Sequence, residues 1–245
     1  MHRGFSALAL ASAVAFSIPA PSLAQSRARI LGIELGSPVS SLPADQWVEP
    51  ACGTNGGPPS LRLERFEDFD RCPVEEATGL REVWFIYDDE WEYIARAYRD
   101  PVEIRSYSAN VFYGQPIITS LLVDDGGLVQ GYRVVTDPRA PTQERMTAYE
   151  LHATFKALFS GAPWQCVAMG REEREDPVEG VFLKEDCVMA FEQRFIRLEG
   201  RNLRKPGQAA FAIPPEGYFE SSVRLEVFHF DAVRDAPCCR ALTQQ

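Results

Sequence analysis

The sequence has few histidines and lacks the common catalytic motifs. Only three of its 245 residues are histidines, and two of them, His152 and His229, lie beyond the N-terminal segment. Neither belongs to a His-Glu-x-x-His pattern, so nothing indicates a zinc enzyme of that type. No Gly-x-Ser-x-Gly or Cys-x-x-Cys motif is present, which removes the usual signals of a hydrolase elbow and of a redox centre. We therefore predict no catalytic residues, no cofactor and no metal.

Long apolar runs are absent after the N-terminus. Arg3 precedes an apolar stretch at 7–18, Pro19 and Pro21 break it, and Ser22-Leu23-Ala24 offers small residues for a signal peptidase. This pattern predicts a signal peptide at 1–24 and a mature chain at 25–245. The apolar stretch is too short to cross a bilayer. We expect a periplasmic or secreted protein with no membrane span.

Basic residues are also scarce relative to acidic ones. The chain has 25 Lys and Arg against 35 Asp and Glu, a formal net charge of −10. Nucleic acids and anionic lipids need a basic surface, so the acidic chain is a poor candidate for binding either, and we predict no nucleic-acid partner. The partner that remains is an unknown protein or small molecule.

The six cysteines all follow the predicted signal peptide. In an exported chain an even count indicates disulfides. Two pairs have nearly equal separations, 72 − 52 = 20 and 187 − 166 = 21, which predicts the bonds Cys52–Cys72 and Cys166–Cys187. The adjacent Cys238 and Cys239 are interpreted as structural bridges that fix the C-terminal tail, with a dithiol that binds soft metals as the alternative.

The central part of the chain predicts a hairpin followed by a helix. β-Branched and aliphatic runs at 117–123 and 128–135 flank the turn sequence 124–127. A helix at about 142–160 follows, because its apolar residues recur at helical spacing. The other strand candidates are 30–35, 81–87, 103–107, 164–169, 181–183, 187–191, 195–199 and 222–230, with a loop at 45–60. The fold class is therefore α+β, with antiparallel hairpins and few helices, in one domain or two similar lobes at about 25–115 and 116–245.

Aromatic residues gather in one region and suggest a surface. Trp84, Tyr87, Trp91 and Tyr93 fall in 81–98, where we favour a second strand over a helix for 91–98. If one side of that hairpin is exposed, these four residues form a recognition surface. The alternative is that both sides are buried.

These observations favour binding over catalysis. We predict a non-enzymatic binding or interaction protein of the cell envelope. A hydrolase that uses two of the many carboxylates is the first alternative, although the sequence does not show which pair would share a cleft. A thiol-redox or soft-metal function of Cys238 and Cys239 is the second.

Three stretches carry a resemblance to a protein family. Arg133-Val134-Val135-Thr136-Asp137-Pro138 leads into the predicted helix, Trp164-x-Cys166 follows it, and the run 219–226 reads Phe-Glu-Ser-Ser-Val-Arg-Leu-Glu. In these stretches the chain resembles uncharacterised exported proteins of Gram-negative bacteria. The resemblance implies export and brings no activity or catalytic residues. The two cysteine-tied halves are also similar to the tandem architecture of β-lactamase inhibitor proteins, which is a binding fold.

Overall fold

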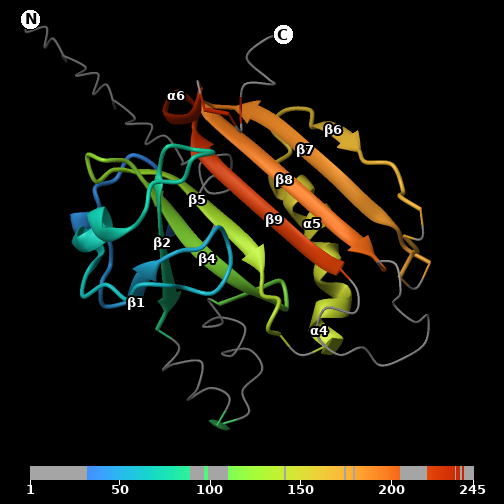
Figure 1. Cartoon of the computed structure of the whole chain (residues 1–245), viewed down its shortest axis with the longest axis horizontal. Coiled ribbons are helices and arrows are strands. Elements are labelled where there is room, and N and C mark those ends of the chain that lie inside the picture. Colours follow the sequence, from blue (N-terminus) through green and yellow to red (C-terminus); the bar gives the residue numbers. More distant parts are fainter. Residues whose placement is uncertain are drawn as a thin grey trace, which may run out of the picture.

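A computed structural model shows one large antiparallel sheet with the helical segment 142–158 on one of its faces (Figure 1). It describes residues 32–88, 97–98, 110–140, 142–173, 175–178, 180–204, 220–234, 236–237 and 239. The nine strands have the order β1-β2-β4-β5-β9-β8-β7-β6, with β3 paired to β4. The predicted α+β class is thus confirmed as a mostly antiparallel sheet with helices.

The strands vary from two to ten residues in length. They are β1 Trp47–Cys52, β2 Arg81–Tyr87, β3 Val111–Phe112, β4 Gln115–Val123, β5 Val129–Thr136, β6 Gln165–Ala168, β7 Leu183–Phe191, β8 Arg194–Leu203 and β9 Glu220–His229. The helices are η2 Val39–Ser41, η3 Phe66–Arg71, α4 Thr142–Thr147, η4 Ala148–Glu150, α5 Leu151–Leu158 and α6 Phe230–Val233.

The predicted hairpin is confirmed as β4–β5, and it lies in the middle of the sheet. Asp124 stabilises its turn, because its side chain accepts hydrogen bonds from the Leu128 amide at 2.9 Å and from Gln130 at 2.7 Å. Gly127 has a φ of 77°, a conformation that favours glycine. Strand β5 then pairs with β9 and β4 pairs with β2, so both strands are covered on both edges.

The two faces of the sheet differ in composition because side chains alternate along each strand. One face is apolar and packs against α5, whose Leu151 and Phe155 join Val134, Leu198 and Leu225 in the main core. Figure 1 shows α4 and α5 behind β9 and β8. The opposite face has a different pattern, with arginines and carboxylates at its centre.

The predicted helix at 142–160 is interrupted. It consists of α4, the 3₁₀ turn η4 and α5. Thr147 has φ −101° and ψ 2°, outside the helical values, and separates α4 from the rest. Because of this break the two helices have different contacts. Helix α5 turns its Leu151, His152 and Phe155 into the interior, while α4 lies against β4 and β9.

Several predicted boundaries are wrong. Residues predicted as a loop at 45–60 include strand β1, which tolerates Pro50 because it lies at the edge of the sheet and carries an irregularity between Val48 and Ala51. The predicted strand at 30–35 is not formed over its described residues, 32–35. The two strands predicted at 181–183 and 187–191 are one strand, β7. The strand predicted at 103–107 lies outside the described residues.

The predicted disulfides are confirmed. Cys52 bonds Cys72 and Cys166 bonds Cys187. Cys239 is buried and disulfide-bonded, while Cys238 lies outside the described residues.

The pairing of β2 with β4 carries the sheet across the lobe boundary suggested near residue 115. The predicted signal peptide lies outside the described residues, and the described helices include none with the length and apolarity to cross a membrane.

Candidate functional site

The predicted aromatic surface is only partly within the described structure. Trp84 and Tyr87 are each 9% exposed, because β2 has neighbouring strands on both edges and is covered on both faces. Tyr87 packs edge-on against Phe85 at 5.2 Å between ring centroids. Trp91 and Tyr93 lie outside the described residues. Trp84 and Tyr87 therefore do not form an exposed recognition surface, and they contribute to the packing of β2.

The most unusual feature of the face opposite α5 is a buried arginine. The side chain of Arg133 on β5 is 2% exposed. Its Nη1 lies 2.7 Å from Glu75 Oε1 and 2.9 Å from Glu82 Oε2, and its Nε donates to Glu226 Oε1 at 2.8 Å. We call these four residues the Arg133 cluster.

The pairing of neighbouring strands brings the residues of the Arg133 cluster together. Arg133 is directly opposite Glu226 on β9, and Glu82 projects from β2 on the same face, while Glu75 precedes β2. Burial alone would lower the pKa of Arg133, but its hydrogen bonds to Glu75 and the charges of Glu226 and Glu82 raise it instead. The guanidinium is therefore permanently charged and holds three carboxylates in fixed positions.

A glycine-containing loop covers the cluster. Glu82 accepts hydrogen bonds from the backbone amides of Asn55 and Gly56, the latter at 3.1 Å. Gly56 has a φ of 83°, and a Cβ atom built there would lie 2.6 Å from Val135 Cγ2. A Cβ atom at Gly53 would lie 2.3 Å from the Glu82 side chain. The glycines at these two positions thus allow the loop to lie directly on the carboxylate, and Cys52 anchors its start.

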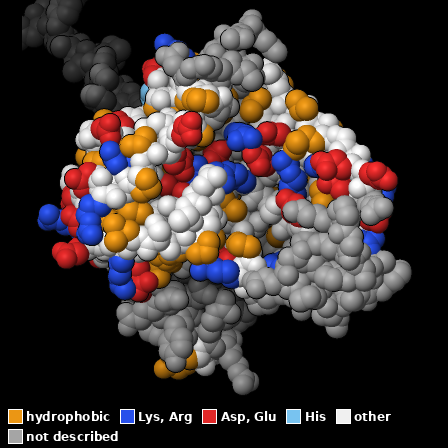
Figure 2. All heavy atoms as spheres, in the orientation of Figure 1, with side chains coloured by type: hydrophobic (Ala, Val, Ile, Leu, Met, Phe, Trp, Pro, Cys, Tyr) orange, Lys and Arg blue, Asp and Glu red, His pale blue; other side chains and the backbone are white. Residues whose placement is uncertain are grey.

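The charges continue from the cluster across β9, β8 and β7. Asp186, Arg197, Glu199, Arg201 and Arg224 form what we call the charged band, and their side chains are 18–30% exposed. Figure 2 shows basic and acidic side chains alternating across the middle of this face. The band is accessible to solvent, in contrast to the buried Arg133 cluster.

Arg197 is the centre of the charged band. Its Nη2 lies 2.9 Å from Asp186 Oδ2 and 2.5 Å from Glu199 Oε1, and its Nη1 lies 3.7 Å from Glu226 Oε2. Arg224 Nη2 also contacts Glu226 Oε1, at 2.8 Å. Glu226 therefore connects the band to the buried cluster. Burial raises the pKa of Glu226, but the charges of Arg224 and Arg133 outweigh burial and hold this pKa below its usual value.

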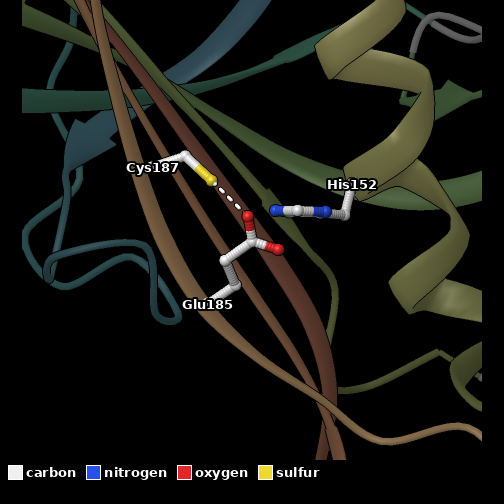
Figure 3. Close-up of side chains that lie close together, drawn as sticks. All are labelled: His152, Glu185 and Cys187. Carbon is white, nitrogen blue, oxygen red and sulfur yellow. Dashed lines mark hydrogen bonds between the residues drawn. The ribbon is translucent and has the colours of Figure 1, made fainter. Parts of the chain in front are cut away.

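A second cluster of polar side chains lies on the face of the sheet that α5 covers. The potential ligand atoms of His152, Glu185 and Cys187 all lie within 4.8 Å of one another. Figure 3 shows the His152 ring pointing toward the Glu185 carboxylate and the Cys187 sulfur. Lys156 donates a hydrogen bond of 2.6 Å to Glu185 Oε1. His152 is buried, and the sequence did not indicate these neighbours.

Burial and the charge of Lys156 lower the pKa of His152; Glu185 raises it and Arg201 lowers it further. The unfolded chain therefore protonates this imidazole at a higher pH than the folded protein does. The resulting stability is complete above the ordinary histidine pKa of 6.5 and is lost as the pH falls through the lower, folded-state pKa. We expect the free energy of unfolding to fall as the pH is lowered through 6.5, by at most about 1.4 kcal/mol per pH unit for one proton.

Urea denaturation at several pH values measures this effect. The decline should be smaller in a His152→Gln variant, which cannot take up the proton. An equal decline in both proteins would show that another group is responsible.

A shallow hollow of about 850 Å³ lies beside the β4–β5 turn. Its lining includes His229, the second histidine considered above, together with Asp124, Asp125 and Asp231. Asp124 is already used by the turn and Asp125 forms a salt bridge of 3.2 Å with Arg81. These contacts explain Asp124 and Asp125 as parts of the fold.

No family model, curated protein or solved structure matches the chain. The resemblance to exported Gram-negative proteins therefore stays a prediction. The sequence did hold one signal of the site that was missed: Glu82, Arg133 and Glu226 are charged residues that lie next to apolar residues in strand runs. A charge in such a run needs a partner of opposite sign, but the run does not identify that partner.

Proposed function

We propose that this chain is an exported, non-enzymatic binding protein of the cell envelope that recognises a basic segment of a partner protein through the charged band. The observation that supports this proposal is a row of partly exposed charges on three adjacent strands, fixed in place by a buried cluster. The two disulfides are compatible with an oxidising compartment. The predicted signal peptide assigns the protein to the periplasm or the exterior.

Prearranged side chains favour binding because little rotamer entropy is lost when a partner arrives. Arg197 is held by Asp186 and Glu199, and Arg224 is held by Glu226 and by the Asn55 carbonyl at 2.8 Å. The partner's charge follows from the acidity of the chain, whose net charge is −10. A basic segment would be attracted over a distance and would share the carboxylates of Asp186 and Glu199 with Arg197 and Arg201, which contact all four of their oxygens.

The two described carboxyl groups whose pKa departs from its usual value lend no support to the hydrolase alternative. A carboxylate hydrolase needs a general acid whose pKa is raised. Among the described carboxyl groups with a resolved shift, Asp137 and Glu226 both have a lowered pKa. The pKa of Glu226 is lowered by Arg224 and Arg133, so ion pairing keeps this carboxylate ionised at neutral pH.

Site-specific photo-crosslinking in cells tests the proposal. A photoreactive amino acid at Ser222, which is opposite Arg201 on β9 and half-buried, places the probe beside the band without removing its charges. The control position is Ala153, an exposed residue of α5, which covers the face of the sheet opposite the charged band. We expect one protein to be crosslinked from Ser222 and not from Ala153. Equal crosslinking from both positions, or none from Ser222, would contradict the proposal.

A further inference from the structure

The disulfide Cys166–Cys187 joins an exposed sheet edge to the interior. Cys166 lies on the edge strand β6, all four residues of which are exposed, and it is directly opposite Cys187 on β7. Cys187 is completely buried. An incoming thiolate can therefore reach the bond from the Cys166 side, whereas the other sulfur faces the protein interior.

The interior sulfur lies among groups that bind metals. Glu185 precedes Cys187 by two residues, so both side chains lie on the face of β7 that α5 covers. Its Oε1 lies 2.9 Å from Cys187 Sγ, the contact drawn as a dashed line in Figure 3. A disulfide sulfur has no proton to donate in such a contact, whereas the free thiol has one.

His152 supplies an independent sign of a ligand. The residue is 5% exposed, and its Nε2 is buried with no hydrogen-bond partner among the described residues. A buried polar atom without a partner is costly and needs an explanation. Gly200 makes room for the ring, because a Cβ atom there would lie 2.6 Å from His152 Cδ2. The imidazole is thus held in place beside Glu185 and Cys187 with its Nε2 free of hydrogen bonds among the described residues.

We propose that reduction of the Cys166–Cys187 disulfide converts this group into a zinc site formed by His152, Glu185, Cys187 and Cys166. Imidazole nitrogen, carboxylate oxygen and thiolate sulfur are the usual ligands of Zn²⁺, and four of them complete its tetrahedral shell. The site lies on the face opposite the charged band, so it is independent of the function proposed above.

Reduction of the disulfide requires a reductant, for which we take a dithiol. The dithiol gives two electrons and two protons to the S–S bond, becomes a disulfide itself, and leaves Cys166 and Cys187 as thiols. When Zn²⁺ binds, both thiols release their protons to solvent. Lys156 must leave Glu185, and its side chain is 29% exposed, so the ammonium can turn into water.

A Cys166→Ser variant tests the site without any reductant. It frees the Cys187 thiol, keeps Cys52–Cys72 intact and leaves His152, Glu185 and Cys187 as three zinc ligands. We expect the folded variant to bind one equivalent of Zn²⁺, and Co²⁺ to give the absorption of a thiolate complex. The wild-type protein, kept oxidised, should bind neither metal at this site.

Matched variants in the Cys166→Ser background locate the ligands. Adding His152→Gln should weaken zinc binding tenfold or more, since even changes around zinc ligands cost about 10–100-fold. Adding His229→Gln should not change it. Wild-type protein reduced with a phosphine, with folding checked by circular dichroism, provides a second route to the same measurement.

The proposal fails if neither the folded variant nor the folded reduced protein binds zinc, or if His152→Gln leaves the affinity unchanged. It also fails if both species unfold, because the site requires the fold to persist after the disulfide is opened.

Discussion

Replacing Arg133 by methionine is expected to lower the free energy of unfolding by about 3–5 kcal/mol, because removing one partner of a buried ion pair leaves charges without compensation. Here the remaining charges are Glu75, Glu82 and Glu226, all held within 3 Å of the guanidinium. Urea denaturation with fluorescence detection measures the loss.

Arg197→Met is the matched control for this prediction. Arg197 also contacts three carboxylates, but its side chain is 28% exposed, so water can solvate the charges left behind. We expect a cost of about 1 kcal/mol or less, as for other accessible ion pairs. A similar cost for both variants would show that burial of the Arg133 cluster does not determine its contribution.

The second large effect concerns the disulfide Cys52–Cys72. Its double alanine variant should lose about 3 kcal/mol of stability, since opening a loop of this length restores entropy to the unfolded chain. Both cysteines are 1% exposed, so the loss of two buried sulfur atoms adds to this cost. Thermal or urea denaturation of the two oxidised proteins provides the comparison.

This disulfide should also be coupled to the Arg133 cluster. Cys52 immediately precedes the loop whose amides bind Glu82, so the bond helps to hold the cover of the cluster in place. Stability changes of the cysteine pair and of Arg133→Met are therefore expected to be non-additive, by about 0.5–3 kcal/mol. Strict additivity would mean that the loop keeps its position without the disulfide.

The parts of the fold that were predicted correctly are encoded locally. The β4–β5 hairpin has its turn residues between two β-branched runs, and strand 81–87 was predicted with its observed bounds because its aromatic and β-branched content is high. The two disulfides were predicted from the nearly equal spacing of the cysteines. In each case the signal lies within about twenty residues of sequence.

The parts that were missed depend on contacts between distant residues or on an irregular backbone. Arg133 is 93 residues from Glu226 and 58 from Glu75, so no local pattern specifies their meeting. His152 and Glu185 likewise come together only when α5 packs on the sheet. Strand β1 was obscured by Pro50 and by Glu49, whose φ of 56° is unusual for a strand residue.

The most direct test of the proposed function is the affinity for the partner captured from Ser222. It should be measured by calorimetry for the wild-type protein and for an Asp186→Asn, Glu199→Gln double variant. Both residues are partly exposed, so the substitutions are expected to leave the fold intact. We expect binding at least about tenfold weaker in the double variant, and weakened by salt in the wild type, as for electrostatic recognition. Equal affinity of the two proteins, with no dependence on salt, would contradict recognition through the charged band.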